Sequence, residues 1–286
     1  MHTKALKTLI RIADVGSFAT AANQLGITLP ALSMQMKTLE QDLGTSLFDR
    51  SFRPPKLTPV GRRIARQAAA VIAAENTLYE IANPQEALSG TYRLGFVATA
   101  SVRLLPLFLE NASTLAPNVH FEFETGLSET LEDKLLSGQL EAAIVTATGD
   151  PTPGINHAVL RREELVYAIP SGYAEMPLGD LVKKLPFLQF NPGSGIGKLI
   201  ASHISRQGSQ RKHTIHLDSV EAIMECVNQG LGFTMLAQPD IERYSKNRLH
   251  ILKPGTKGIF RQLVLATSER GVAKAARQKL CELFKG

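Results

Sequence analysis

Two short segments of the sequence carry residue types that could do chemistry. The segment Gly193-Ser194-Gly195-Ile196-Gly197-Lys198 has the glycines and the lysine of a phosphate-binding loop. A Walker loop requires Ser or Thr directly after the lysine, where this chain has Leu199, and the first glycine of that motif would fall on Pro192. The segment therefore predicts either a plain turn or a loop whose backbone N–H groups open a helix, an arrangement that can bind a carboxylate.

The second segment holds His216, Asp218 and Ser219, which are the residue types of a hydrolytic triad. Ser219 directly follows Asp218 and is placed as a helix N-cap, and nothing nearby resembles a nucleophile elbow. The seven histidines lack metal-ligand spacing, and Cys226 and Cys281 form neither a CxxC motif nor a disulfide framework. We therefore predict no catalytic residue, no metal site, no cofactor and no enzymatic activity.

A third set of polar residues follows the expected strands of the second half of the chain. Ligands of open α/β sheets bind beyond the carboxyl ends of the strands, so these residues predict a ligand cleft. Hydroxyl groups and helix N-termini favour a small anion such as a carboxylate, although each residue could instead be a cap or a turn. Arg103 could add charge, or it could be an ordinary surface residue. The predicted ligand-binding residues are Thr99, Ala100, Ser101, Thr146, Asn191, Ser194, Ser219 and Phe233.

The positive charge of the chain lies in its first quarter. Ten of the 32 Lys and Arg residues, but only four of the 26 Asp and Glu residues, lie within residues 1–66. The remaining residues are balanced, so the whole net charge of +6 belongs to this first part. A basic module beside a neutral one indicates that only the first part binds a polyanion, and a basic solvated face is the alternative.

This basic part is expected to fold as three short helices. Glycines at 16, 26 and 44 stop them, and Ser17 and Thr28 are good N-caps for the second and third. A short helix, a tight turn and a following helix predict a helix-turn-helix. Its core would hold Leu25, Leu32, Met36 and Leu39.

The opposite face of the third helix carries short or polar side chains that could enter a major groove. Residues 47–58 then predict a strand-turn-strand wing with three cations that can reach phosphates or a minor groove. Leu29 and Met34 could belong to the core or contact thymine methyl groups, and Gln35 could be a solvated helix residue. The predicted DNA-contacting residues are Thr28, Pro30, Ala31, Ser33, Met34, Gln35, Lys37, Arg50, Arg53 and Lys56.

A single long helix is expected over residues 59–82, with Thr58 as its N-cap and Pro59 at its first position. Little of the neighbouring chain is left to cover its apolar stripe, so we expect it to pair with a second copy. Packing against its own domain is the alternative. Asn83-Pro84 ends this helix, and Ser89-Gly90 completes a hinge.

From residue 91 the pattern alternates between strands and helices, which predicts an α/β fold with a mostly parallel sheet. Its length of about 195 residues allows two lobes. No segment is apolar for the roughly 18 residues that a membrane span needs, and the N-terminus lacks the apolar core of a signal peptide. We expect a cytoplasmic protein with no membrane partner.

One set of motifs runs through the first 65 residues: Gly16-Ser17-Phe18, Ala21-Ala22, Leu25, Ser33, Leu39-Glu40, Leu43-Gly44, Leu47-Phe48, Arg50, Leu57-Thr58 and Gly61. Together these residues resemble the LysR-type transcriptional regulators, and the resemblance covers residues 5–65 nearly without gaps. Residues 221–235, with Gly230-Leu231-Gly232-Phe233, look like the family's second-lobe strand and its preceding helix.

The resemblance implies a winged helix-turn-helix domain in residues 1–58, a dimerising linker helix and hinge in 59–89, and an effector-binding domain in 90–286. This last domain would be built like a periplasmic binding protein, with lobe I at about 90–161 and 267–286 and lobe II at about 162–266. The effector would lie between the lobes. Leu29 and Met34 stand where members often have polar residues, which bears on the recognised sequence and not on DNA binding itself.

The implied function is a sequence-specific transcriptional regulator whose activity a small-molecule effector modulates. The implied partners are double-stranded promoter DNA, the effector, further copies of the chain as a homodimer or homotetramer, and RNA polymerase. Two hypotheses from other classes compete with it: a solute-binding module with a vestigial basic arm, and an α/β enzyme.

Overall fold

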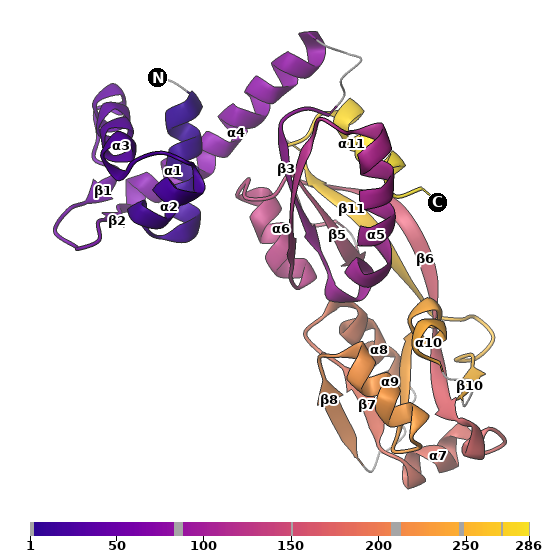
Figure 1. Cartoon of the computed structure of the whole chain (residues 1–286). Coiled ribbons are helices and arrows are strands. Elements are labelled where there is room, and N and C mark those ends of the chain that lie inside the picture. The colour runs from indigo at the N-terminus through magenta and orange to yellow at the C-terminus, as the bar shows by residue number, and fades with distance from the viewer. Residues whose placement is uncertain are drawn as a thin grey trace.

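A computed structural model describes residues 3–82, 88–149, 151–206, 213–245, 249–269 and 271–285. The chain forms a helical N-terminal module, one long helix and a two-lobed α/β region (Figure 1). Asn83 and Pro84, predicted to end the long helix, lie outside the described residues. None of the helices described combines the length and the apolar composition needed to cross a bilayer.

The N-terminal module is a winged helix-turn-helix, as predicted. Ser17 and Thr28 cap the second and third helices, each by accepting a hydrogen bond from a backbone N–H three residues on at 3.3 Å. Gly44 ends the third helix with a left-handed φ of 63°, which only glycine adopts without strain. The elements are α1 (Thr3–Val15), α2 (Phe18–Gln24), α3 (Leu29–Leu43), β1 (Phe48–Asp49) and β2 (Lys56–Leu57).

The long helix α4 (Pro59–Ala82) has the predicted bounds. Its start is fixed by the Thr58 hydroxyl, which accepts a hydrogen bond from the Gly61 N–H at 2.9 Å. The first half of α4 packs against α1 through the buried side chains of Ala65 and Ala68. Farther along, Leu78 is 68% exposed. The helix therefore packs against its own domain over its first half and leaves apolar side chains uncovered beyond it.

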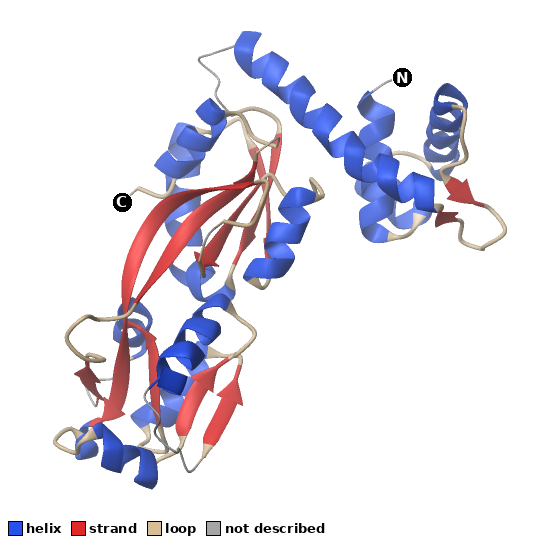
Figure 2. Cartoon of the chain, turned by 180° about the vertical axis from the view of Figure 1, so that it is seen from behind, coloured by secondary structure: helices blue, strands red, loops and turns tan. Residues whose placement is uncertain are grey.

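The α/β region contains one mixed sheet in the order β4-β3-β5-β11-β6-β9-β7-β8, with β10 paired to β6. Figure 2 shows long strands that run from one lobe into the other. Its strands are β3 (Thr91–Phe96), β4 (His120–Thr125), β5 (Ala142–Ala147), β6 (Ile155–Pro170), β7 (Phe187–Phe190), β8 (Thr214–Leu217), β9 (Phe233–Ala237), β10 (Leu249–Leu252) and β11 (Phe260–Ser268). Its helices are α5 (Ala98–Leu115), α6 (Ser128–Leu136), α7 (Leu178–Lys184), α8 (Gly195–Arg206), α9 (Val220–Asn228), α10 (Gln238–Tyr244) and α11 (Lys274–Glu282).

Two parallel three-stranded units, β4-β3-β5 in lobe I and β9-β7-β8 in lobe II, are joined by the antiparallel strands β6 and β11. The expectation of a mostly parallel sheet was therefore wrong for the crossover between the lobes. An apolar run marks β6 only over residues 165–169, where it is buried in lobe II. Its first half, 155–164, is only partly buried and carries charges, so it lacks the apolar run that marks a strand.

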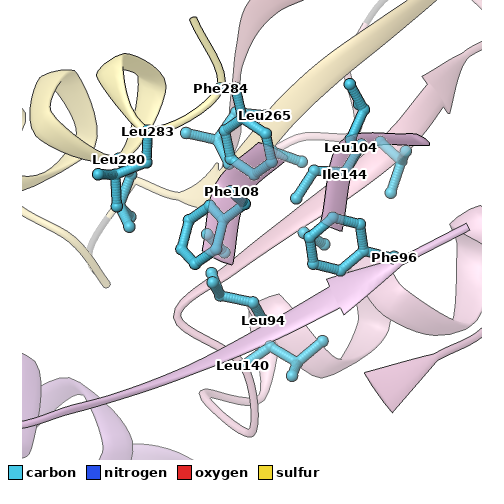
Figure 3. Packing of buried hydrophobic residues seen from close by; sticks show 14 of the residues in the cluster. Leu94, Phe96, Leu104, Phe108, Leu140, Ile144, Leu265, Leu280, Leu283 and Phe284 are labelled. Carbon is cyan, nitrogen blue, oxygen red and sulfur yellow. The ribbon is translucent and has the colours of Figure 1, made fainter. Parts of the chain in front are cut away.

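Each lobe has its own hydrophobic core, and the N-terminal module has a third. In lobe I the ring of Phe108 on α5 lies at the centre of an aromatic cluster (Figure 3). Its centroid is 4.9 Å from that of Phe121 and 5.0 Å from that of Phe284, which follows α11. The chain therefore returns after building lobe II to complete the core of lobe I.

Gly61→Ala should destabilise the N-terminal module by about 2–3 kcal/mol, the upper range for overpacking. A Cβ on Gly61 would lie 2.2 Å from the backbone carbonyl oxygen of Leu47, which cannot rotate away. Hydrogen exchange of the α1 and α4 amides measures the loss. The control is Gly179→Ala in α7, where a Cβ meets no atom within 4 Å. Equal protection in the two variants would contradict this account of the packing.

Candidate nucleic-acid interface and effector cleft

One face of α3 is available to a DNA groove. Its inner face buries Leu32, Met36 and Leu39, while Ser33 and Lys37 are exposed on the other side. Leu29 and Met34 are 45% and 69% exposed, so both belong to the surface and not to the core. The apolar residues that depart from the family pattern are therefore placed where they can meet base edges.

Gln35 is turned away from this face. Its side-chain oxygen accepts a hydrogen bond from the Thr8 hydroxyl at 2.8 Å, and Thr8 is buried in α1. The prediction that Gln35 contacts DNA is corrected, because its side chain joins α3 to α1. Sequence spacing alone did not separate it from Ser33, since these two residues flank the apolar stripe on opposite sides at similar angles.

A hollow of about 630 Å³ lies in front of α3 and is bounded by the wing. It also involves residues at the start of α2 that the sequence reasoning missed. Their proximity follows from the tight turn between α2 and α3, which sequence spacing could have suggested. The lining residues are Ser17, Phe18, Ala19, Leu29, Ser33, Met34, Lys37, Arg50, Pro54 and Pro55.

The three cations of the wing have different environments. Arg50 donates to Glu40 at 2.8 Å, and Glu40 also accepts from the backbone N–H groups of Leu47 and Phe48, so this arginine helps to fix the wing to α3. The ammonium of Lys56 lies 4.7 Å from the ring centroid of Phe52. Arg53 is exposed and has no ion-pair partner in the described part of the chain. It is the wing cation most available to a phosphate.

A cavity of about 230 Å³ lies between the two lobes, where strands β3, β4, β5, β7 and β8 end. Carboxyl ends from both lobes therefore meet at one place, as in other ligand sites of open α/β sheets. Above it Lys198 on α8 forms an ion pair with Glu129 on α6, which connects the lobes. The lining residues are Val97, Ala98, Thr99, Thr125, Gly126, Leu127, Ser128, Thr146, Phe190, Asn191, Ser194, Gly195, Ile196 and Asp218.

Four of the predicted ligand-binding residues, Thr99, Thr146, Asn191 and Ser194, line this cavity. Ser219 lines a second hollow of about 240 Å³ that adjoins it and shares Ala98, Thr99, Phe190 and Asp218. The sequence reasoning missed Thr125 and Ser128, although both stand at the end of β4 or the start of α6. It considered Asp218 only as part of a triad.

Three predicted ligand-binding residues lie elsewhere. β3 ends at Phe96 and α5 begins at Ala98, so positions 99–101 point in different directions from the first turn of a helix. Ala100 is buried in the lobe I core, and the Ser101 hydroxyl donates to the Ala98 carbonyl at 2.9 Å. Phe233 begins β9 and packs on Phe187 at a centroid distance of 5.3 Å in the lobe II core.

The hydroxyl groups of the cavity are oriented by fixed donors. Thr99 accepts a hydrogen bond from Arg261 at 2.9 Å, and Ser128 accepts from the Thr146 N–H at 3.3 Å. Each hydroxyl proton therefore remains able to donate to a ligand. Thr146 is 3% exposed, and its hydroxyl has no hydrogen-bond partner among the residues described. Ser194, in contrast, already donates to the Asn191 carbonyl.

A buried cluster of charges lies directly behind Thr99. Arg261 on β11 is fully buried and donates to Glu163 on β6 at 2.7 Å and to Asp240 on α10 at 2.9 Å. Arg103 on α5 pairs with the same two carboxylates at 2.8 and 2.9 Å. The interpretation of Arg103 as a surface residue was wrong, because its side chain is 19% exposed and completes this cluster. Two cations and two anions thus join both lobes to the crossover strands.

The N-terminal module contacts lobe I through a smaller charged group. Arg93 on β3 lies 2.9 Å from Glu141 and 3.8 Å from Asp14 on α1. Burial raises the pKa of the Asp14 carboxyl, against the opposing effect of Arg93. Gly138 packs directly on Ala69 of α4, where a Cβ would lie 2.1 Å from that of Ala69.

The two cysteines belong to different lobes. Cys226 packs against the lobe II core and Cys281 against the lobe I core, so they cannot pair with each other. Burial also raises the pKa of the Cys281 thiol.

Comparison with known proteins identifies this arrangement. The profile of the LysR substrate binding domain matches residues 85–286, and that of the bacterial regulatory helix-turn-helix protein, lysR family, matches residues 3–62. The chain belongs to the LysR family. It is a transcriptional regulator with a helix-turn-helix DNA-binding domain and an effector-binding domain, and not an enzyme.

Relatives of this LysR regulator have the same organisation. A probable RuBisCO transcriptional regulator of Porphyra purpurea is 30% identical over 240 residues, covering 79% of this chain and 75% of the relative. The HTH-type transcriptional regulator CzcR of Bacillus cereus is 27% identical over 246 residues, or 86% and 83% of the two chains.

Among solved structures, a full-length OxyR variant of Pseudomonas aeruginosa matches with a TM-score of 0.79 at 23% identity, covering 99% of this chain and 94% of that one. Full-length CbnR complexed with its target DNA matches with a TM-score of 0.59 at 19% identity, over 99% of each chain. The predicted fold class, a winged helix-turn-helix followed by a two-lobed α/β domain, is confirmed.

Arg261→Met should destabilise the effector-binding domain by about 3–5 kcal/mol, the cost of leaving buried carboxylates without their cation. Urea unfolding of the full chain measures this loss. The matched control is Lys253→Met, which removes an exposed cation from the neighbouring Glu164 and should cost less than about 1 kcal/mol. Similar losses for the two variants would show that the buried cluster has no special role.

Proposed function

We propose that this regulator binds an interrupted palindromic promoter site as a symmetric dimer, and that a carboxylate-bearing effector in the cleft between the lobes changes how it holds the DNA. The observation that carries the DNA-binding part is the exposed face of α3 beside a basic wing. The competing hypotheses of an α/β enzyme and of a solute-binding module are not supported, because the family match covers both the DNA-binding and the effector-binding part of the chain.

Base readout is assigned to the first turns of α3. Ser33 and Lys37 can form hydrogen bonds to base edges, whereas Leu29 and Met34 can contact only apolar groups such as thymine methyls. Pro30 and Ala31 are exposed beside them and small enough to let α3 approach closely. Thr28 uses its hydroxyl oxygen to cap α3, and its proton remains free for a phosphate.

Backbone contacts are assigned to the wing. Arg53 and Lys56 are exposed and can neutralise phosphates or enter a minor groove. Arg50 contributes mainly by fixing the wing through Glu40, and its side chain, which is 61% exposed, can still approach a phosphate.

Dimerisation is assigned to the outer face of α4. Val71 and Leu78 are exposed and lie seven residues apart, which places them on one stripe of the helix. The proposed boundary at about 89 is supported by the separate cores of the N-terminal module and lobe I, whereas the first half of α4, assigned to the linker, shares the core of the N-terminal module through Ala65 and Ala68. A dimer of dimers, contact with RNA polymerase and action in the cytoplasm complete the proposal by analogy with the family.

The effector is assigned to the cavity because its polar groups are donors. The hydroxyls of Thr99 and Ser128 accept from fixed donors and keep a proton to donate, and the hydroxyl of Thr146 has no partner among the described residues. Helices α5, α6 and α8 begin at its edge, and the N-caps of α5 and α6, Val97 and Leu127, have no side-chain oxygen to satisfy the first N–H groups. This is a site for an oxyanion such as a carboxylate.

Arg53→Ala should weaken DNA binding and reduce the slope of log affinity against log salt by about 0.9, the effect of one lost phosphate contact. Fluorescence anisotropy with a labelled duplex at several salt concentrations measures both. Lys183→Ala on lobe II is the control and should change neither quantity. If the slope is unchanged in Arg53→Ala, Arg53 does not contact a phosphate.

A Val71→Glu and Leu78→Glu double variant should shift the protein from dimer toward monomer, because two charges on the stripe would repel their symmetry mates. Sedimentation velocity measures the shift. The charge control is Arg66→Glu, which is also exposed on α4 but lies roughly 140° around the helix from Val71. A double variant that sediments like the parent protein would place the dimer interface elsewhere.

A further inference from the structure

The cleft between the lobes is lined by neutral hydroxyl donors and by one carboxylate, that of Asp218, which narrows the chemistry of its ligand. We propose that the effector is a zwitterion, such as an α-amino acid or a close relative, that carries an ammonium group beside its carboxylate. This inference rests on the proposed function of the cleft as the effector site.

The donors of the cavity are neutral. Thr99, Ser128 and Thr146 line it with hydroxyl groups that can donate to a ligand, near the starts of α5, α6 and α8. No Lys, Arg or His is among the described residues that line the cavity. A carboxylate bound here is therefore held by hydrogen bonds and helix N-termini, and its full negative charge is not neutralised by a cation.

The acceptor of the cleft is Asp218, which follows β8 and precedes α9. It is the only charged residue among the described residues that line the cavity, and like Thr99 it also lines the adjoining hollow. Asp218 is exposed, and its carboxylate has no hydrogen bond or ion pair with any residue that the structure describes. Asp218 is thus a solvated acceptor open to a ligand cation.

A ligand with only a carboxylate would bring a second uncompensated negative charge into this space. Two like charges in one cleft repel each other, and this repulsion grows as bound ligand and protein exclude water from between them. An ammonium group removes this repulsion and gains a charge-assisted hydrogen bond to Asp218. The amino group would then lie between the ligand carboxylate and the adjoining hollow.

The adjoining hollow fits the remaining part of such a ligand. Val102, Phe190, Val220 and Tyr244 give it apolar walls, and its volume of about 240 Å³ is similar to that of the main cavity. Its rim also carries the charged residues Glu221, Asp240 and Arg243. A side chain that leaves the ligand's α-carbon next to Asp218 would enter this space. The sequence-based expectation of an anionic effector is thereby refined to a ligand with both charges.

Isothermal titration calorimetry of the full chain tests the proposal. The probes are the twenty standard α-amino acids, together with the des-amino and 2-hydroxy analogues of any that bind. At least one amino acid should bind, and removal of its amino group should weaken binding about tenfold or more. Asp218→Asn should weaken the amino acid to the level of its analogue and leave the analogue unchanged, whereas the control Asp180→Asn on α7 should alter neither.

Two results would contradict the proposal that the effector is a zwitterion. One is binding of a des-amino acid as tightly as its parent with no effect of Asp218→Asn. The other is that no amino acid binds at all. Neither result would contradict the assignment of the effector to this cavity. That assignment has its own test: it is wrong if Ser128→Ala and Thr146→Val leave the affinity for a bound carboxylate unchanged.

Discussion

The arrangement of the two lobes depends on one guanidinium group that has no access to water. A fully buried arginine must have acceptors for its donors, and Arg261 finds them in Glu163, Asp240 and Thr99. These partners come from the crossover strand β6, from lobe II and from lobe I. A change in the angle between the lobes would lengthen at least one of these bonds, so the resting lobe arrangement is fixed where the cleft begins.

The Arg261 guanidinium also couples ligand binding to the arrangement of the lobes. Thr99 lines the cavity with one side of its hydroxyl and accepts from Arg261 with the other, so a ligand that pulls on Thr99 also acts on the buried charges. Lobe I in turn contacts the N-terminal module through Arg93 and Asp14. A continuous set of polar contacts and packed elements thus runs from the cleft to α1, which braces α3 through Thr8 and Gln35.

The sequence predicted those features of the fold that depend on interactions between residues close together in the chain. The caps at Ser17 and Thr28, the glycine that ends α3 and the bounds of α4 follow from backbone chemistry and were predictable. Tertiary contacts decided the rest. The first half of β6 owes its conformation to pairing with β11, and it carries no apolar run of its own.

In the sites, the residue types were predictable but their directions were not. Ala100 and Phe233 lie close in sequence to the ends of strands, as Thr99 does, but the backbone directs their side chains into the lobe cores. Gln35 and Ser33 lie on the same helix, but Gln35 lies at an angle from which its side chain reaches α1. The charged cluster brings together positions 103, 163, 240 and 261, which are far apart in the chain, so no spacing rule points to it. Such contacts between distant positions become visible only in the folded chain.

The central claim is that two exposed α3 faces, held at a fixed spacing by paired α4 helices, read DNA symmetrically. Selection of bound fragments from random duplex DNA by the purified full chain tests it most directly. The account predicts an interrupted palindrome with half-sites separated by one helical turn, about 10 base pairs, or a multiple of it. Recovery of fragments without sequence preference, or of a single unrepeated site, would contradict it.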